Sequence, residues 1–152
     1  MQNTLETTPK PIMGFSDEYR WLSNFWESPI TVIGMNYRNV ESAYQAAKTI
    51  NTAHRQQFAD MTGGQAKRAG RNVILRPDWD FVKLEIMELC LRAKFMTHKD
   101  LAEKLVNTGS VDIIELNTWG DTTWGQIKDN QGNLTGDNLL GKLLMNIRSD
   151  IK

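Results

Sequence analysis

The segment VESAYQAAK, residues 40–48, decides the fold, because the spacing of its residues is that of a short amphipathic helix. At about 100° per residue, one face of this helix carries polar and aromatic side chains, namely Glu41, Tyr44, Gln45 and Lys48. The other side is small and can approach a neighbouring element closely; it consists of Ala43, Ala46 and Ala47. Asn39 precedes the segment as a helix N-cap, so the sequence predicts a helix from Val40 to about Ile50.

The polar face of this helix has two interpretations. It is either a solvated surface, on which Glu–Gln–Lys pairs contribute a few tenths of a kcal/mol each, or a functional face. In the second case Glu41 and Lys48 form an acid/base pair that shifts both pKa values. Periodicity alone does not decide between the two.

The segments around residues 40–48 predict a mainly helical α+β domain. Before them, residues 29–37 suit a small hairpin, and residues 1–11 suit a flexible tail. After them we expect a helix at 54–61 that stops at Gly63-Gly64, a short helix at 65–70, a long helix at 78–95 with Asp78 as its cap, and a helix at 98–108. We also expect a strand at 111–115, a long loop at 117–137 and a last helix capped by Asp137 or Asn138. The fold class is therefore α+β, a single domain at 12–152 with about five or six helices and a few short strands.

Composition limits the classes of function. A formal net charge of zero argues against binding driven by nonspecific neutralisation of phosphates. The single cysteine, Cys90, forms no internal disulfide, and this suits a reducing compartment such as the cytoplasm. We expect no signal peptide, no membrane span, no metal site and no cofactor, because the chain has no matching apolar run or ligand motif.

Three further features are candidate parts of a site. Lys94 projects from the apolar side of its predicted helix, so it must pair, reach solvent or line a polar cavity. The loop at 119–125 holds Asp121 between two tryptophans, which suits a platform for a flat ligand or merely a tight turn. The helix start at 136–138 offers free N–H groups for an anion, although simple capping explains it equally well.

Taken in order, these stretches resemble the NADAR, or YbiA-like, family over nearly the whole chain. The resemblance rests on Phe15, on Trp21-Leu22-Ser23-Asn24-Phe25, on residues 40–48, on Trp79, Lys94-Phe95, Leu105, Thr108-Gly109, Glu115, Asp121 with Trp124-Gly125, and on residues 136–145 with Arg148. Two positions depart from the common pattern: Ser42 follows Glu41 where many relatives have His, and residues 126–129 differ from some relatives. Both departures concern the choice of substrate more than the type of reaction.

The resemblance implies an N-glycosidase that hydrolyses a ribosyl C1′–N bond in a nucleotide-like substrate. Removal of ADP-ribose from guanine, as the nucleoside or in nucleic acid, is the first expectation. The alternatives are phosphoribosylamino-pyrimidine intermediates of riboflavin synthesis, or a non-catalytic protein that binds NAD or ADP-ribose. The implied catalytic residues are Glu41, Lys48, Lys94 and Asp121. The implied substrate-binding residues are Trp21, Ser23, Asn24, Phe25, Tyr44, Gln45, Trp79, Trp124, Gly125 and Asn138.

Overall fold

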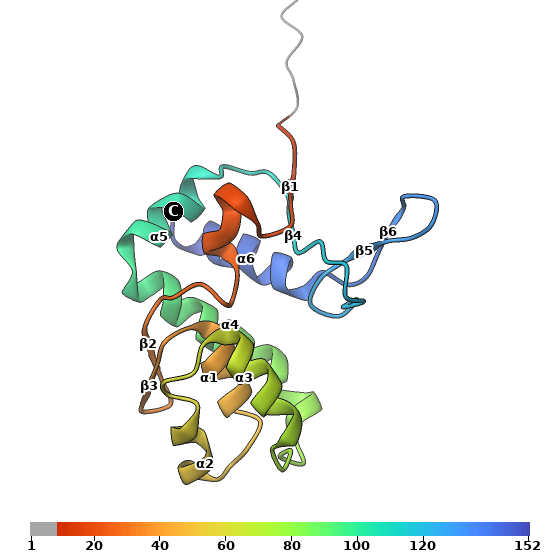
Figure 1. The fold of residues 1–152 in the computed structure, drawn as a ribbon. Helices are drawn as coiled ribbons and strands as arrows, with labels where there is room; N and C mark the ends of the chain where they lie inside the picture. Colours follow the sequence, from red (N-terminus) through yellow and green to blue (C-terminus); the bar gives the residue numbers. More distant parts are fainter. Residues whose placement is uncertain (1–8) are drawn as a thin grey trace, which may run out of the picture.

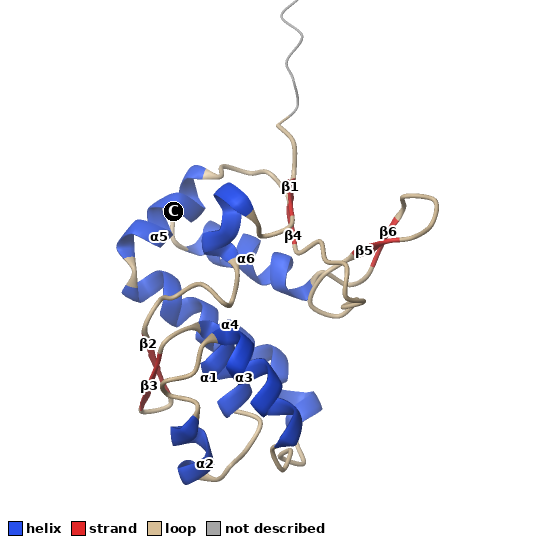
Figure 2. Cartoon of the chain, viewed as in Figure 1, coloured by secondary structure: helices blue, strands red, loops and turns tan. Residues whose placement is uncertain are grey.

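The structure, a computed structural model, describes residues 9–152, so most of the predicted tail at 1–11 lies outside the described residues. The described part is a mainly helical α+β domain with a few very short strands, as predicted (Figures 1 and 2). Its helices are η1 (Asp17–Leu22), α1 (Val40–Ala46), α2 (Thr52–Gln57), α3 (Gly63–Ala69), η2 (Gly70–Asn72), α4 (Trp79–Thr97), α5 (Lys99–Asn107) and α6 (Leu139–Asp150), where η denotes a 3-10 helix.

The strands form three pairs. The predicted hairpin is present as β2 (Ile30–Val32) and β3 (Met35–Tyr37), which are antiparallel. β1 (Ile12–Met13) pairs in parallel with β4 (Ile113–Ile114) and brings the start of the described chain beside its last third. The region 117–137 was predicted as loop throughout, but it contains a small antiparallel pair, β5 (Ile127–Lys128) and β6 (Leu134–Thr135).

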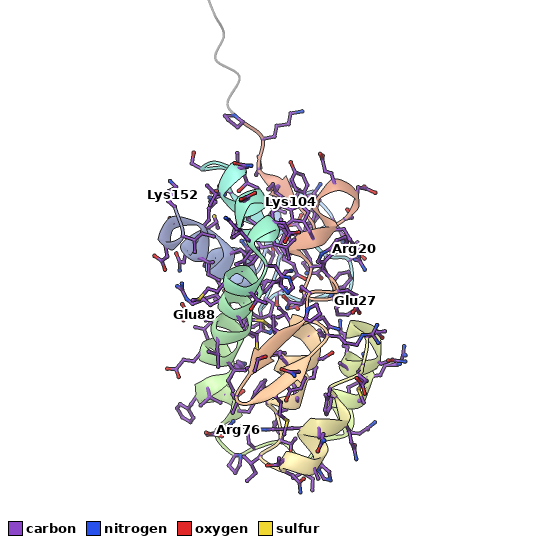
Figure 3. All side chains as sticks on the ribbon, turned by 90° about the vertical axis from the view of Figure 1, so that its left-hand side faces the viewer. Arg20, Glu27, Arg76, Glu88, Lys104 and Lys152 are labelled. Carbon is purple, nitrogen blue, oxygen red and sulfur yellow. The ribbon has the colours of Figure 1, made fainter. Side chains whose placement is uncertain are left out.

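The long helix α4 organises the molecule, because it contacts α1, α5, α6 and β2 (Figure 1). Its apolar side contributes Met87, Cys90 and Leu91 to the core, while Glu88 lies on the outer side, away from Arg20 on η1 (Figure 3). Asp78 occupies the N-cap position of α4, as predicted, but its side chain does not cap the helix. The Asp78 carboxylate makes no cap hydrogen bond, since it is paired with Arg76 at 2.6 Å.

Helix α1 is shorter than predicted and is buried on all sides. Asn39 caps it as expected, because its side chain accepts a hydrogen bond from the Ser42 N–H. The helix ends at Ala46 instead of continuing to Ile50, because the chain tightens into a turn in which the Lys48 N–H donates to the Gln45 carbonyl. Packing against α3 and α4 encloses the helix, so its polar face is not a solvated surface.

Helix α3 begins where the sequence suggested a helix stop. Gly63 and Gly64 were interpreted as a break, but they form its first turn behind a Thr62–Gln65 capping box. A Cβ atom at position 63 would collide with the ring of Phe25, so glycine there permits close packing of α3 on the segment after η1. This contact brings α3 next to residues 23–25 and to α1.

Candidate active site

A cavity of about 430 Å³ opens among three separate parts of the chain. They are the segment around η1, the buried helix α1 with the neighbouring α3, and the loop that follows β4. Of the predicted site residues, those that line the cavity are Ser23, Asn24, Phe25, Glu41, Tyr44, Gln45, Lys48, Asp121 and Trp124. A volume of this size suits a small ligand such as a ribose with part of a base or phosphate.

Glu41 is the most enclosed carboxylate of the cavity. Its side chain is 8 % exposed, and its oxygen accepts a 2.8 Å hydrogen bond from the Gln45 amide one turn later. Burial raises the pKa of Glu41 above its usual value, while the hydrogen bond from Gln45 and the nearby lysines act in the opposite direction. Because burial disfavours the charged form, this carboxyl group takes up a proton during a reaction more readily than an exposed carboxyl group does.

Lys48 lies beside Glu41 on the cavity wall although it is no longer helical. Its ammonium is 6.0 Å from the ring centres of both Tyr44 and Trp79. Burial lowers the pKa of Lys48, the charge of Glu41 raises it, and the charge of Arg71 lowers it further. Lys48 therefore loses its proton at a lower pH than an ordinary lysine does.

Aromatic rings form a connected group around this lysine. Tyr44 packs on Trp79 at 5.1 Å between ring centres and meets Trp124 edge-on at 5.6 Å. Tyr44 and Trp124 line the cavity, whereas Trp79 is buried behind Tyr44 and does not reach it. Trp79 was predicted to bind substrate, and the structure places it where it holds Tyr44 and Lys48.

The loop at 115–125 forms the wall opposite α1. Asp121 lines the cavity, but one oxygen of its carboxylate accepts hydrogen bonds from the N–H groups of Thr123 and Trp124 at 3.0 and 2.9 Å. Asn117 fixes the same loop, because its amide donates to the Asp121 carbonyl and its oxygen accepts from the Asp121 N–H. Asp121 therefore shapes the loop with one oxygen and leaves the other for the cavity.

Glu115 is a third carboxylate of the cavity, and sequence reasoning did not place it among the site residues. Burial, followed by the negative charge of Asp121, raises the pKa of Glu115 to about 7. A Cβ atom at Gly125 would collide with the Glu115 carboxylate and carbonyl, so glycine leaves room for this side chain. The available signal was a carboxylate at the end of a predicted strand, directly before a loop rich in Asn, Gly and Asp.

Lys94 does not line the cavity, although it was predicted to be catalytic. Its side chain is fully buried, and its Nζ donates to the backbone carbonyls of Trp21 and Ser23 at 2.7 and 3.0 Å. Burial lowers the pKa of Lys94 to about 7. Lys94 thus fixes the end of η1, from which Ser23 reaches the cavity. Trp21 is buried in the core and lies outside the cavity wall.

The start of α6 is not open to an anion. The N–H groups of residues 137–140 donate to the carbonyls of residues 122–125, so the first turn of the helix is occupied by the loop. Asn138 has a left-handed backbone (φ 50°), and its side chain bridges the Glu115 N–H and the Ile113 carbonyl. The predicted anion site is wrong for this reason, and Asn138 and Gly125 support Glu115 instead of lining the cavity.

Three buried acceptor atoms of the described residues have no donor, and all belong to residues of the cavity wall. They are Asn24 Oδ1, Gln45 Oε1 and Glu115 Oε2. Buried polar atoms without partners are costly. Their concentration here sets the residues of the cavity wall apart from the rest of the described protein.

Further lining residues were not among the predicted site residues. They are Phe15, Arg20, Lys67, Met87, Leu116, Trp119 and Leu140. Arg20 and Lys67 add positive charge from η1 and α3, elements that local sequence patterns do not connect with residues 40–48. Within residues 9–152 we find no cluster of three or more His, Cys, Asp or Glu side chains that could hold a metal ion.

Comparison with known proteins identifies the family. Residues 13–152 match the NADAR domain. The chain belongs to the NADAR domain family. It is similar to the N-glycosidase YbiA of Shigella flexneri, with 34% identity over 154 residues that cover 99% of this chain and 93% of that protein. It is also similar to a riboflavin biosynthesis protein of Vibrio vulnificus, with 30% identity over 139 residues that cover 90% of this chain and 36% of that protein.

Among solved structures, the fold matches the NMR structure of the Escherichia coli protein YbiA. The TM-score is 0.78 at 33% sequence identity, and the match covers 99% of this chain and 90% of that one. The family, the α+β fold and the enzyme class, a hydrolase of N-glycosyl bonds, are thereby confirmed. No helix of the described residues is both long and apolar enough to span a bilayer.

Proposed function

We propose that this NADAR protein hydrolyses the bond between a ribosyl C1′ and a base nitrogen in a nucleotide-like substrate, and that its first substrate is ADP-ribose linked to guanine. The observation that carries the proposal is that Glu41 and Glu115, two buried carboxyl groups with raised pKa values, line one cavity beside the amine of Lys48 and the aromatic side chains of Tyr44 and Trp124. Breaking a C1′–N bond needs charge stabilisation at the sugar and a proton for the leaving base, and these groups supply both.

In the proposed mechanism Glu41 acts at the sugar. Its carboxylate stabilises the positive charge that develops at C1′ and accepts a proton from the attacking water. The water oxygen bonds to C1′ as the C1′–N bond breaks. Asp121 is the alternative for this role, but its bonded oxygen has less freedom to take the proton.

Glu115 supplies the proton for the leaving base. With a pKa of about 7, a large fraction of Glu115 is protonated at neutral pH, and it transfers this proton to the base nitrogen as the bond breaks. Lys48 holds a phosphate or, in a covalent variant, its neutral amine condenses with the C1′ aldehyde of the ring-opened sugar after the base has left. This condensation releases one water, and a second water later hydrolyses the imine and frees the sugar and the amine. Lys94 cannot take this part, because its Nζ is enclosed by the Trp21 and Ser23 carbonyls.

The proposed substrate rests on charge. Arg20 on η1, Lys67 on α3 and Lys48 in the turn after α1 reach the cavity from three parts of the chain. Three cations are more than a single phosphate monoester requires and suit the diphosphate of ADP-ribose. Phosphoribosylamino-pyrimidines of riboflavin synthesis are the second candidate, because one similar protein carries a riboflavin biosynthesis name.

A release assay separates the candidates. ADP-ribosylated oligonucleotide, ADP-ribosyl guanosine and phosphoribosylamino-uracil are incubated with the protein side by side, and the freed base or sugar is measured. We expect release from the guanine conjugates to have the highest kcat/KM. A higher value for the pyrimidine would support the second candidate, and binding without release from any of them would indicate a non-catalytic binder of nucleotides.

A further inference from the structure

A groove next to the cavity concentrates positive charge on a protein whose net charge is zero. The groove has a volume of about 340 Å³ and is lined by Phe25, Gly64, Lys67, Arg68, Arg71 and Trp119. It contains three cationic side chains and no carboxylate. Because the chain as a whole is neutral, this charge is local and is not a share of a generally basic surface.

The three cations come from one short stretch of chain and remain available. Lys67 and Arg68 project from α3, and Arg71 follows in η2, one turn after Lys67. Within residues 9–152, none of the three forms an ion pair, although Arg38, Arg76, Lys83 and Arg92 do. Arg68 and Arg71 are exposed and Lys67 is half-buried, and a group of such cations without carboxylate partners favours an anionic ligand.

An aromatic side chain completes the groove. Trp119 is 63% exposed, and the Lys67 ammonium lies 5.3 Å from the centre of its ring. An exposed tryptophan beside cations is the usual combination for a stacked nucleobase with its phosphate. An acidic peptide would use the cations and leave the ring without a function.

The groove is continuous with the cavity. Phe25, Lys67 and Trp119 line both. The charge of Lys67 also acts on Glu41 and Glu115, so this lysine stands between the carboxyl groups and the groove. A ligand whose ribose occupies the cavity can therefore extend along α3 without leaving the protein surface.

We infer that this groove is a subsite for a nucleobase and its phosphate that are covalently linked to the substrate's ribose. The inference rests on the proposed function, because it extends the substrate of that site. Two sources have this chemistry: the adenosine diphosphate part of ADP-ribose, and the neighbouring nucleotide of a single strand that carries the modified base. In both cases Arg68 and Arg71 bind phosphate, and Trp119 stacks on the base.

The test measures binding of two unmodified probes, ADP-ribose and a single-stranded oligothymidylate of about eight nucleotides, to the full chain. Arg68→Gln is the test variant, because Arg68 is exposed and does not line the cavity. Lys99→Gln is the matched control, since it removes one exposed charge at the start of α5. Affinities are taken from tryptophan fluorescence at several salt concentrations, with hexaglutamate as a probe of charge alone.

We expect Arg68→Gln to weaken binding of one probe about fivefold or more, and Lys99→Gln to leave it unchanged. If that probe is the oligonucleotide, Arg68→Gln should also reduce the slope of log affinity against log salt concentration by about one. The probe that is weakened identifies the source of the phosphate. Equal affinities of wild type and Arg68→Gln for both probes, or hexaglutamate binding as tight as that of the probes, would overturn the inference. If the wild-type protein released no base from any candidate substrate while its binding of a probe still depended on Arg68, the result would count against the proposed function alone.

Discussion

At the scale of single residues, the site depends on how few protein groups stabilise its carboxylates. Glu41 has one side-chain partner, Gln45, and otherwise faces a cavity and apolar surroundings. Its ionised form is therefore costly in the folded protein, as its raised pKa indicates. This is an arrangement for reactivity and not for stability.

Glu41→Gln tests whether Glu41 serves the reaction and not the stability of the fold. The amide keeps the size of the side chain and an oxygen that accepts from Gln45, but it can neither carry a negative charge nor accept a proton from water. We expect kcat/KM to fall about a hundredfold or more, while the unfolding midpoint stays equal or rises. Full turnover in a correctly folded variant, judged by circular dichroism, would remove Glu41 from catalysis.

Glu115→Gln tests the proton donor through pH dependence. The folded pKa of about 7 predicts that wild-type kcat/KM falls as pH rises through 7, because the donor loses its proton. The variant should have low activity, and its kcat/KM should not fall further as pH rises through 7. If the same fall were seen in the variant, a group other than Glu115 would cause it.

Stability gives an independent check on the same carboxyl group. The folded pKa of Glu115 is raised, so its stabilising contribution is complete below the unfolded pKa near 4.5 and is lost as pH rises towards 7. The free energy of unfolding of Glu115→Gln should therefore decline less over this interval than that of the wild type.

At the scale of elements, the loop at 115–125 and α6 form one unit that shapes the site. Gly125 passes so close to Glu115 that a methyl group would collide with its carboxylate. Gly125→Ala should move Glu115 and lower kcat/KM at least tenfold. Ser110→Ala is the control, because Ser110 is exposed between α5 and β4 and lines neither the cavity nor the groove beside it. Equal activities of the two variants would contradict the proposed role of Glu115.

Helix α4 supports the opposite wall through Lys94. Lys94→Met leaves the Trp21 and Ser23 carbonyls without their donor, at a cost of about 1–3 kcal/mol. A neutral amine still has two hydrogens for these carbonyls, so the folded pKa of about 7 makes wild-type stability rise between pH 7 and 10.5. In urea unfolding, the difference from Lys94→Met should thus be larger at pH 9 than at pH 6.5. Lys83→Met, which removes a half-buried lysine of the same helix that is paired with the exposed Asp80, should show no such difference.

At the scale of the whole molecule, local patterns predicted elements better than they predicted the site. Periodicity and caps depend on neighbours in sequence, so the start of the helix at Val40, its Asn39 cap and the hairpin within residues 29–37 were predicted correctly. The end of that helix was predicted at about Ile50, but it lies at Ala46. Lys94 was predicted on the apolar side of its helix, and it is indeed fully buried. Its partners, 71 and 73 residues away, have no local signal.

The cavity shows the same limit. Glu115 shares the cavity with Glu41 because β4 pairs with β1 and the loop docks on α6, and neither contact has a trace in the sequence around residue 115. The glycines at 63 and 64 were predicted to stop a helix for a related reason. The close packing of Gly63 on Phe25 is a tertiary contact that the local sequence does not show. The family resemblance placed Asp121 and Trp124 near Glu41, whereas local spacing did not.

The docking of the loop on the first turn of α6 has a consequence for hydrogen exchange. The first amide protons of a helix usually exchange rapidly, because they have no partner within the helix. Here the amides of residues 137–140 donate to the carbonyls of residues 122–125, so they can exchange only when this loop lifts from the helix. We expect these four amides to exchange slowly and at one common rate. That rate, measured by mass spectrometry or NMR, would report how often the wall carrying Asp121 and Trp124 opens.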